Sequence, residues 1–191
     1  MDSAEDYEQF ANEFLQLRDD SLIGRKEVRS WVQKLPKAAD VLEIACGGGY
    51  PISRELLQAG VKLSAIDSSP TLLKTFAERF PQVSIKCEKI QDSDLFDRQF
   101  DAVICIGMVF LLSEDEQRSF IAKVAKVVKP NGQFLFTAPK EVGCWRDILT
   151  RTKSFTLGYD DYVSCLEASG FRLLDTFVDA GQNNYYLAQR L

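Results

Sequence analysis

The stretch Val41-Leu42-Glu43-Ile44-Ala45-Cys46-Gly47-Gly48-Gly49-Tyr50 carries most of the information about how this chain folds. It starts as a short apolar run, typical of a buried strand, and ends in three consecutive glycines. Pro51 then begins a helical pattern that ends at Gly60. Because glycine has no Cβ, a ligand can approach the backbone of such a loop closely, and the helix start behind it offers free N–H groups. A strand, a glycine loop and a helix in this order indicate a nucleotide-type cofactor site.

The residues around the glycines narrow the kind of cofactor. A dinucleotide fingerprint reads Gly-x-Gly-x-x-Gly, but Ile52 stands where its third glycine belongs. No Gly-Lys-Ser/Thr follows, so the loop is not a P-loop for phosphates. Glu43 lies four residues before Gly47, where an acid would repel a pyrophosphate but could attract an ammonium group. These features disfavour a cofactor held by its pyrophosphate.

The stretch closely resembles motif I of the class I S-adenosylmethionine-dependent methyltransferases. That motif usually reads hydrophobic-hydrophobic-Asp/Glu-hydrophobic-Gly-x-Gly-x-Gly. Cys46, Gly47 and Gly49 match it and Gly48 is a common choice, whereas Ala45 replaces the usual first glycine. The resemblance implies S-adenosyl-L-methionine as cofactor and S-adenosyl-L-homocysteine as product. In this stretch it implies cofactor contacts from Glu43, Ala45, Cys46, Gly47 and Gly49.

A second signal lies at the end of the next predicted strand. Asp67 follows that strand, and Ser69-Pro70 then start a helix, with serine as N-cap and proline in the first helical position. An acid about 20 residues beyond a glycine loop is placed to bind the two hydroxyls of a ribose. We therefore expect Asp67, with Ser68 beside it, to bind the cofactor. The alternative is an acid that only favours the helix dipole.

The resemblance implies two further cofactor segments. After the third predicted strand, Glu88 or Lys89 falls where the family places a polar side chain against the adenine amine, and Ile90 is placed to pack on the ring. After the fourth strand, Ile106 and Gly107 match the loop that faces the methionine moiety. The alternatives are a solvated loop with one buried isoleucine and a strand that runs into a packed loop.

The composition excludes several classes of protein. The net charge is −5, with acids and bases interspersed, so there is no strong signature of nucleic-acid binding. No apolar run approaches the ~20 residues of a membrane span. The N-terminus is acidic, unlike a secretory signal, and the five cysteines form no Cys-x-x-Cys pair. We expect reduced thiols in a cytoplasmic protein, with neither disulfides nor a metal site.

The chain contains no histidine. Its absence removes the usual general base and excludes hydrolases with a Ser-His-Asp or Cys-His arrangement. Methyl transfer is compatible with it, because the cofactor supplies the activated methyl group and the protein mainly aligns donor and acceptor for in-line attack. No residue stands out as a catalytic base, and we assign no catalytic residue.

Strands and helices alternate along the chain. We predict strands at 41–45, 61–66, 82–87, 101–106, 133–138, 171–179 and 184–190. Helices are predicted at 4–17, 22–35, 51–59, 70–80, 159–169 and between Ser113 and Pro130, where Ser113 and Glu116 form a capping box. We interpret 88–98 as a loop, and 139–158 as irregular with a short helix near Trp145.

This alternation predicts an α/β fold with a mainly parallel sheet, helices on both faces and an antiparallel C-terminal hairpin. The resemblance implies the finer arrangement, a Rossmann-like three-layer sandwich with a seven-stranded sheet of order 3-2-1-4-5-7-6. We expect a single methyltransferase domain over 1–191, with an N-terminal helical cap at 1–36 and the Rossmann-like core at 37–191.

The sequence says less about which residues bind the methyl acceptor. The N-terminal helices and residues 139–158 are free to cover the crevice at the carboxyl ends of the strands. Tyr7, Arg25, Trp145 and Arg146 are candidates for it, although structural roles are at least as plausible for each. The polar residues Gln182-Asn183-Asn184 fit a turn better than an acceptor site.

Three functional hypotheses follow. The favoured one is an S-adenosylmethionine-dependent methyltransferase whose acceptor is a small molecule that we do not name. The second is a methyltransferase-like binding or regulatory module without turnover, motivated by Ala45 and by the missing base. The third, an NAD-dependent reductase, would require a nicotinamide cofactor to bind more tightly than S-adenosylmethionine.

Overall fold

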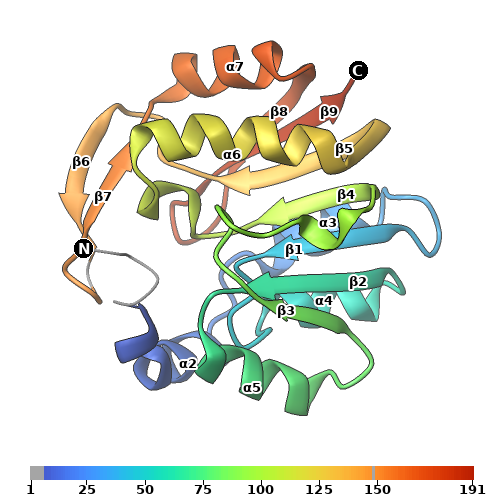
Figure 1. Cartoon of the computed structure of the whole chain (residues 1–191), viewed down its shortest axis with the longest axis vertical. Helices are drawn as coiled ribbons and strands as arrows, with labels where there is room; N and C mark the ends of the chain where they lie inside the picture. Colours follow the sequence, from blue (N-terminus) through green and yellow to red (C-terminus); the bar gives the residue numbers. More distant parts are fainter. Residues whose placement is uncertain (1–6, 148) are drawn as a thin grey trace.

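The computed structural model describes residues 7–147 and 149–191, and a seven-stranded sheet forms its centre (Figure 1). The strands are β1 (Asp40–Ile44), β2 (Lys62–Asp67), β3 (Ser84–Cys87), β4 (Phe100–Cys105), β5 (Val128–Thr137), β8 (Phe171–Val178) and β9 (Asn184–Arg190). Their order is β3-β2-β1-β4-β5-β9-β8. The first five run parallel, whereas β9 is antiparallel to β5 and to β8. The predicted order 3-2-1-4-5-7-6 is confirmed, because β8 and β9 are the sixth and seventh strands of this sheet along the chain.

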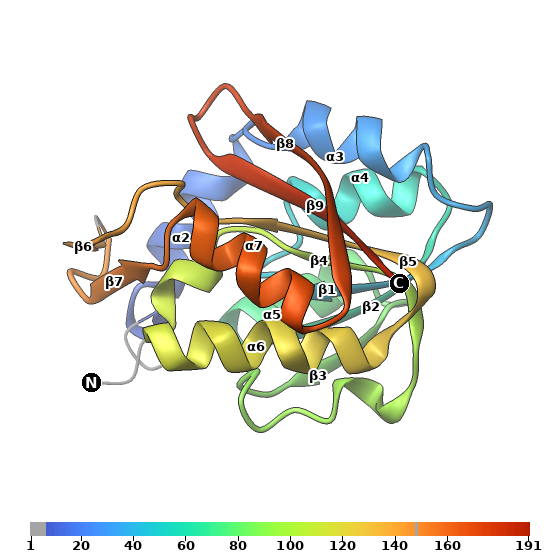
Figure 2. The same ribbon diagram turned by 90° about the horizontal axis from the view of Figure 1, so that it is seen from above.

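Helices cover both faces of the sheet and make three layers (Figure 2). One face carries α3 (Arg25–Val32), α4 (Ile52–Gln58) and α5 (Pro70–Arg79), and the other carries α6 (Glu114–Val127) and α7 (Tyr159–Ala168). A separate apolar cluster fills the space under each helical layer. Strand β1 is buried from Val41 to Ile44, as expected of a central parallel strand covered on both sides. The predicted Rossmann-like α/β class is therefore confirmed.

Two helix starts form as the sequence predicts. Ser69 caps α5 by accepting a hydrogen bond from the backbone N–H of Leu72, and Pro70 occupies the first helical position. The capping box of Ser113 and Glu116 begins α6, with both of its reciprocal hydrogen bonds present. Both caps fix the directions in which these helices leave the carboxyl edge of the sheet.

Other boundaries differ from the prediction for local reasons. Strand β1 ends one residue early, because Ala45 has a left-handed φ of 59°. Strand β5 begins at Val128 rather than 133, because Val128 pairs with Phe100 and an irregularity in register then accommodates Asn131. Two short 3-10 helices, η1 (Leu95–Asp97) and η2 (Val109–Leu111), form where no helix was predicted. Helix α2 (Ala11–Asp19) covers the second half of the predicted helix 4–17 and ends two residues beyond it, and residues 4–6 lie outside the described residues.

The prediction for residues 139–158 was wrong. The described residues of this range form no helix near Trp145 but an antiparallel hairpin of β6 (Gly143–Arg146) and β7 (Lys153–Thr156). Asp147 closes its turn, since its Oδ1 accepts hydrogen bonds from the backbone N–H groups of Leu149 and Thr150. The strand signal is weak in the sequence because β6 is exposed along its whole length and so shows no alternation of apolar and polar residues.

Candidate cofactor-binding site

A pocket opens at the carboxyl ends of β1, β2, β3 and β4. Parallel strands bring their carboxyl ends to one edge of the sheet, and ligands of open α/β folds bind outside that edge. Most of the predicted cofactor residues line this pocket: Ala45, Gly47, Asp67, Ser68, Glu88, Lys89, Ile90, Ile106 and Gly107. Four separate segments of the sequence therefore meet at one place.

Asp67 connects two of these segments. Its Oδ2 accepts a hydrogen bond of 2.8 Å from the backbone N–H of Gly47, and its Oδ1 accepts one of 2.9 Å from that of Ser69. Burial raises the pKa of this carboxyl group, while the backbone donors oppose the shift. Each carboxylate oxygen has a second lone pair, so Asp67 can still accept hydrogen bonds from a ligand. Its geometry suits a pair of ligand hydroxyls.

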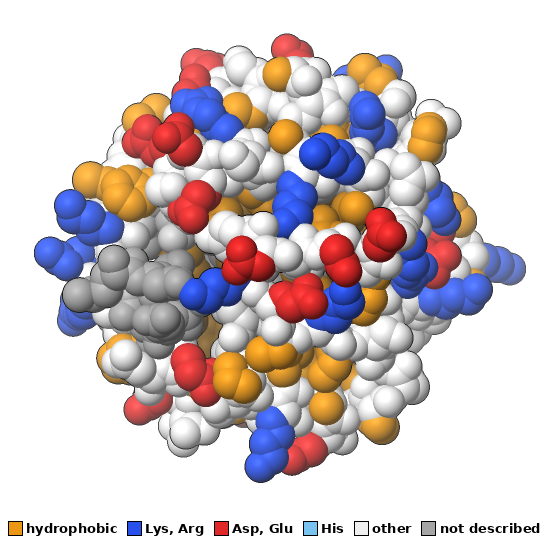
Figure 3. Space-filling view, in the orientation of Figure 1, with side chains coloured by type: hydrophobic (Ala, Val, Ile, Leu, Met, Phe, Trp, Pro, Cys, Tyr) orange, Lys and Arg blue, Asp and Glu red, His pale blue; other side chains and the backbone are white. Residues whose placement is uncertain are grey.

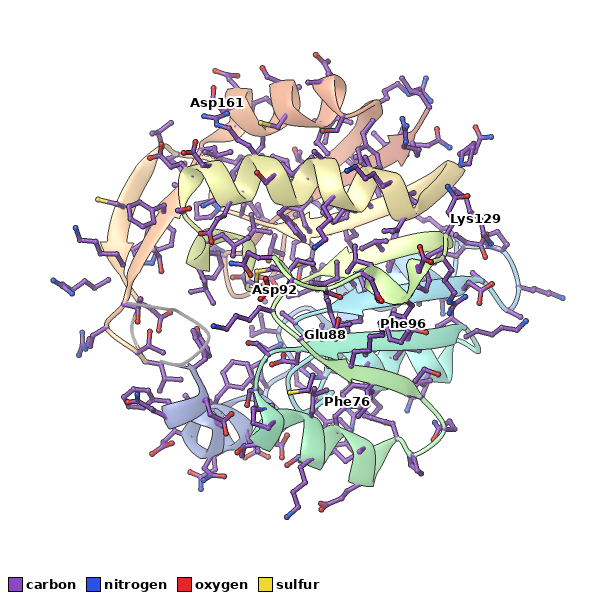
Figure 4. All side chains as sticks on the ribbon, viewed as in Figure 1. Phe76, Glu88, Asp92, Phe96, Lys129 and Asp161 are labelled. Carbon is purple, nitrogen blue, oxygen red and sulfur yellow. The ribbon has the colours of Figure 1, made fainter. Side chains whose placement is uncertain are left out.

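Glu88 offers the pocket an unused acceptor. This residue, labelled in Figure 4, directly follows β3, and its Oε2 is buried without a hydrogen-bond partner among the described residues. Leaving a buried acceptor without a partner is unfavourable, so a donor supplied by a ligand would stabilise this oxygen. The exocyclic amine of an adenine is such a donor. The unpartnered oxygen of Glu88 is thus compatible with an adenosyl cofactor.

Backbone conformation shapes the glycine loop. Ala45 and Gly47 both have left-handed φ angles, of 59° and 55°. A Cβ on Gly49 would lie 2.4 Å from the ring of Phe80, so this glycine is required for packing against the end of α5. At Gly107 a Cβ would meet no atom within 4 Å, which leaves open space on that wall of the pocket. The loop therefore combines Gly49, which is needed for packing, with Gly47, which lines the pocket.

Three predicted cofactor residues do not line the pocket. Gly49 packs on Phe80 as described, and Cys46 is buried in the apolar cluster under α4. Glu43 is also buried, and its Oε2 accepts a 2.6 Å hydrogen bond from the hydroxyl of Ser53 on α4. The contact of these residues with a cofactor stays a prediction.

Glu43 makes the stability of the fold depend on pH. Its burial raises the pKa from 4.5 to about 8, against the hydrogen bond from Ser53, and the charge of Asp67 adds to the rise. The folded protein then holds a proton that the unfolded chain releases, so this contribution is complete below pH 4.5 and is lost as pH rises towards 8. We expect the free energy of unfolding to fall by up to about 1.4 kcal/mol per pH unit in that window.

Glu43→Gln tests this expectation, because glutamine resembles the protonated acid and does not titrate. Urea unfolding at pH 5.5, 6.5 and 7.5 should show a smaller slope for the variant than for the wild type. Glu55→Gln is the matched control: desolvation raises the pKa of Glu55, but hydrogen bonds from Arg29 and Arg25 lower it overall. The control should lose stability without changing the slope, and equal slopes for Glu43→Gln and wild type would contradict the assignment.

The N-terminal segment covers the pocket. Tyr7 and Phe14 are part of its lining, and the Tyr7 hydroxyl donates a 3.3 Å hydrogen bond to Asp147 in the hairpin turn. Glu8 accepts hydrogen bonds from the hydroxyls of Ser69 and Thr71 at the start of α5. Two distant parts of the chain, α5 and the hairpin, are thus joined across the pocket by one segment.

The other residues considered for the acceptor site lie outside the lining of the cofactor pocket. Arg25 pairs with Glu55 at 2.7 Å between α3 and α4, away from the pocket. Trp145 packs on Phe110 with ring centroids 5.7 Å apart. Arg146 lines a neighbouring pocket. Gln182 and Asn183 lie in the turn closed by Asp179, whose carboxylate accepts hydrogen bonds from Asn183, which confirms that interpretation for these two residues, whereas Asn184 begins β9.

Sequence reasoning missed several apolar residues of the pocket as site residues: Phe14, Ile44, Ile66 and Leu72. Strand and helix patterns identify them as buried but do not distinguish a pocket wall from core. Among the described residues there is no group of three or more His, Cys, Asp or Glu side chains that could hold a metal ion. No described helix has the length and apolar character needed to cross a membrane.

Comparisons with known proteins agree with this geometry. Residues 41–132 match the family model of a methyltransferase domain. A ubiquinone biosynthesis O-methyltransferase of Xanthomonas axonopodis pv. citri is 30% identical over 107 residues, which cover 53% of this chain and 44% of that protein. The chain spans about half the length of the curated relatives it matches.

Two solved structures show the same fold over nearly the whole chain. The magnesium protoporphyrin IX methyltransferase of Synechocystis PCC 6803, solved with S-adenosylmethionine bound, has a TM-score of 0.79 at 16% identity and covers 100% of this chain and 98% of its own. The 1,6-didemethyltoxoflavin-N1-methyltransferase of Burkholderia thailandensis has a TM-score of 0.79 at 15% identity and covers 98% and 86%. At these identities the likeness concerns the fold.

Proposed function

We propose that this chain is a class I S-adenosylmethionine-dependent methyltransferase that transfers a methyl group from S-adenosylmethionine to a small-molecule acceptor. The observation that carries this proposal is the meeting of Asp67, the glycine loop and the unpartnered Glu88 oxygen in one pocket at the carboxyl edge of the sheet. Each of these groups would contact a different part of the bound cofactor.

Different pocket residues would contact the ribose, the adenine and the methionine part of the cofactor. Asp67 would accept hydrogen bonds from the ribose hydroxyls, and Glu88 would accept one from the adenine amine. Ile90 supplies an apolar wall beside Glu88. Ala45 and Gly107 lie on the walls where the backbone allows close approach of the methionine part. When bound, the cofactor supplies a methyl group already activated on a sulfonium.

The chain's own contribution is positioning. Tyr7 reaches the pocket, and burial together with the charge of Asp147 raises the pKa of its hydroxyl well above the usual range. The hydroxyl therefore stays protonated and acts as a hydrogen-bond donor rather than as a base. Phe14 and the N-terminal segment exclude water from the pocket, which favours alignment of donor and acceptor for in-line attack.

Two observations support a small acceptor. The relatives named above are, by their names, enzymes of ubiquinone biosynthesis, of magnesium protoporphyrin IX and of 1,6-didemethyltoxoflavin, all small molecules. The net charge of −5 offers no electrostatic attraction to a nucleic acid.

Calorimetric titration tests the proposal first. S-adenosylmethionine and S-adenosylhomocysteine should bind the purified protein, whereas NADH and NADPH should not. A metabolite panel scored by release of S-adenosylhomocysteine then tests turnover. Tighter binding of a nicotinamide cofactor would replace the proposal by a reductase, and cofactor binding without turnover across a broad panel would favour a binding module.

Ala45→Gly tests whether the departure from the family motif weakens the site. Glycine takes the left-handed conformation of Ala45 without the steric cost, so the variant should gain about 1 kcal/mol of stability in urea unfolding. Its affinity for S-adenosylmethionine should stay within a factor of three of wild type. Ala38→Gly is the matched control, because Ala38 has a similar φ of 54° in an exposed turn. A gain in affinity of tenfold or more confined to Ala45→Gly would show that the alanine methyl obstructs the cofactor.

A further inference from the structure

A second pocket adjoins the first on the side of the hairpin. It is built from β6, β7 and residues 150–152 between them, together with η2 and the start of α6. Gln91 and Leu111 line both pockets, so the two spaces share a wall. A molecule that lies across this shared wall would reach the cofactor pocket with one end and the hairpin with the other.

The second pocket has a basic rim. Arg146, Arg151 and Lys153 line it, and all three side chains are exposed. Arg146 donates a 3.0 Å hydrogen bond to the backbone carbonyl of Arg151, but none of the three forms an ion pair within residues 7–147 and 149–191. Lys and Arg side chains gather at the edge of the molecule where β6 and β7 lie (Figure 3). This concentration of positive charge stands out in a chain whose net charge is −5.

Two acids lie near this rim, Glu116 in the lining of the second pocket and Asp147 in the hairpin turn. The Glu116 carboxylate accepts hydrogen bonds from the backbone and hydroxyl of Ser113 and from the amide of Gln91, as part of the cap of α6. The Asp147 carboxylate accepts those that close the hairpin turn and the one from Tyr7. Within the described part of the chain neither carboxylate forms an ion pair with Arg146, Arg151 or Lys153, so these basic side chains remain available to a ligand.

Apolar groups adjoin the basic ones. Leu111 and Phe155 line the same pocket, and the Phe110–Trp145 pair packs η2 against β6. Arginine binds carboxylate and phosphate groups with parallel hydrogen bonds, and its attraction falls off with added salt when it is exposed. The rim therefore suits an anionic group, and the inner wall suits an apolar or aromatic body.

We infer that the second pocket binds the anionic group of the methyl acceptor, a carboxylate or a phosphate, through Arg146, Arg151 and Lys153, while the acceptor's apolar body extends over Leu111 towards the cofactor. This inference rests on the proposed function for its link to methyl transfer. The recognition of an anion by the pocket is a property that can be measured without turnover.

Matched pairs of probes test it by ligand-observed NMR titration of the full chain. The carboxylate pair is 4-hydroxybenzoate and its neutral isostere 4-hydroxybenzamide; the phosphate pair is phenyl phosphate and phenol. The anionic member of at least one pair should bind roughly tenfold or more tightly than the neutral member, since a charge-assisted contact is lost in the latter. That preference should weaken between 20 mM and 300 mM NaCl. The pair with the larger preference identifies the anion.

Charge reversal locates the interaction. Arg151→Glu and Lys153→Glu should each remove most of the preference for the anion, whereas Lys26→Glu, an exposed change on α3, should keep it. Arg146→Gln provides a milder variant should a reversal impair folding. All variants should bind S-adenosylmethionine as the wild type does, because none of these residues lines the cofactor pocket.

The outcomes separate this inference from the proposed function. Equal binding of anionic and neutral probes, no binding of either member at millimolar concentration, or an equal loss in Lys26→Glu would overturn the inference. Failure of wild-type protein to bind S-adenosylmethionine would instead contradict the proposed function and would leave the measured anion preference as it stands. A preference that the hairpin variants abolish, with cofactor binding intact, would support both.

Discussion

Gly47→Val is expected to abolish binding of S-adenosylmethionine while the sheet still folds. Gly47 lines the cofactor pocket with a left-handed φ of 55°, and a Cβ at this position would lie 3.1 Å from the ring of Phe14 on α2. A β-branched side chain there either projects into the pocket or shifts the loop and the segment that covers it. Calorimetric titration should show no detectable cofactor binding, and circular dichroism should show wild-type secondary structure.

Gly60→Val separates this effect from backbone strain. Gly60 follows α4 with a left-handed φ of 81°, and a Cβ at this position would meet no atom within 4 Å. Both variants should lose about 1–3 kcal/mol of stability from the unfavourable conformation, but Gly60→Val should bind cofactor normally. Normal binding by Gly47→Val would mean that the glycine loop does not contact the cofactor.

Asp67→Ala should weaken binding of S-adenosylmethionine by about 1–3 kcal/mol, or roughly 5- to 150-fold, the scale of lost hydrogen bonds to a charged group. The change removes the acceptor for ligand hydroxyls and also releases the backbone N–H groups of Gly47 and Ser69. Affinity and stability should therefore fall together. Asp67→Asn keeps a carbonyl oxygen and should be intermediate in both measurements.

Asp101→Ala is the control for a lost strand-end carboxylate. Asp101 accepts a 2.8 Å hydrogen bond from the backbone N–H of Asp40 and another from Lys129, at the amino ends of the strands. Its replacement should reduce the free energy of unfolding and leave the dissociation constant for S-adenosylmethionine unchanged. If Asp67→Ala binds cofactor as tightly as the wild type does, the assignment of Asp67 to the ribose is wrong.

Much of the fold and part of the candidate site could be predicted because their signals are local. Apolar runs, the capping box at Ser113 and Glu116, and the serine-proline start of α5 each depend on residues close together in the sequence. Parallel strands meet at one edge once their order is fixed, so the positions after β1, β2, β3 and β4 converge without further information. The position of Asp67 therefore follows from the strand pattern, whereas Glu88 and Gly107 are expected there through the resemblance to the family motifs.

The hairpin and the N-terminal cover could not be predicted in the same way. The four-residue strands β6 and β7 are short, and their pairing depends on the turn at Asp147 and on packing of Trp145 against Phe110. The helical pattern near Phe14 indicates an apolar face but does not say that this face closes a pocket. These contacts join residues that are far apart in the chain.

The α/β class, the glycine loop and the acid at the end of β2 can thus be predicted from the sequence alone, and the order of the strands can be predicted through the resemblance of its motifs. Three features emerge only when the chain is folded: Ser53 holds Glu43 outside the pocket lining, Tyr7 and Phe14 cover the pocket, and the hairpin forms a second, basic pocket. The difference arises because propensity and periodicity act between near neighbours, whereas a pocket depends on which distant side chains pack together and which polar atoms that packing leaves without a partner.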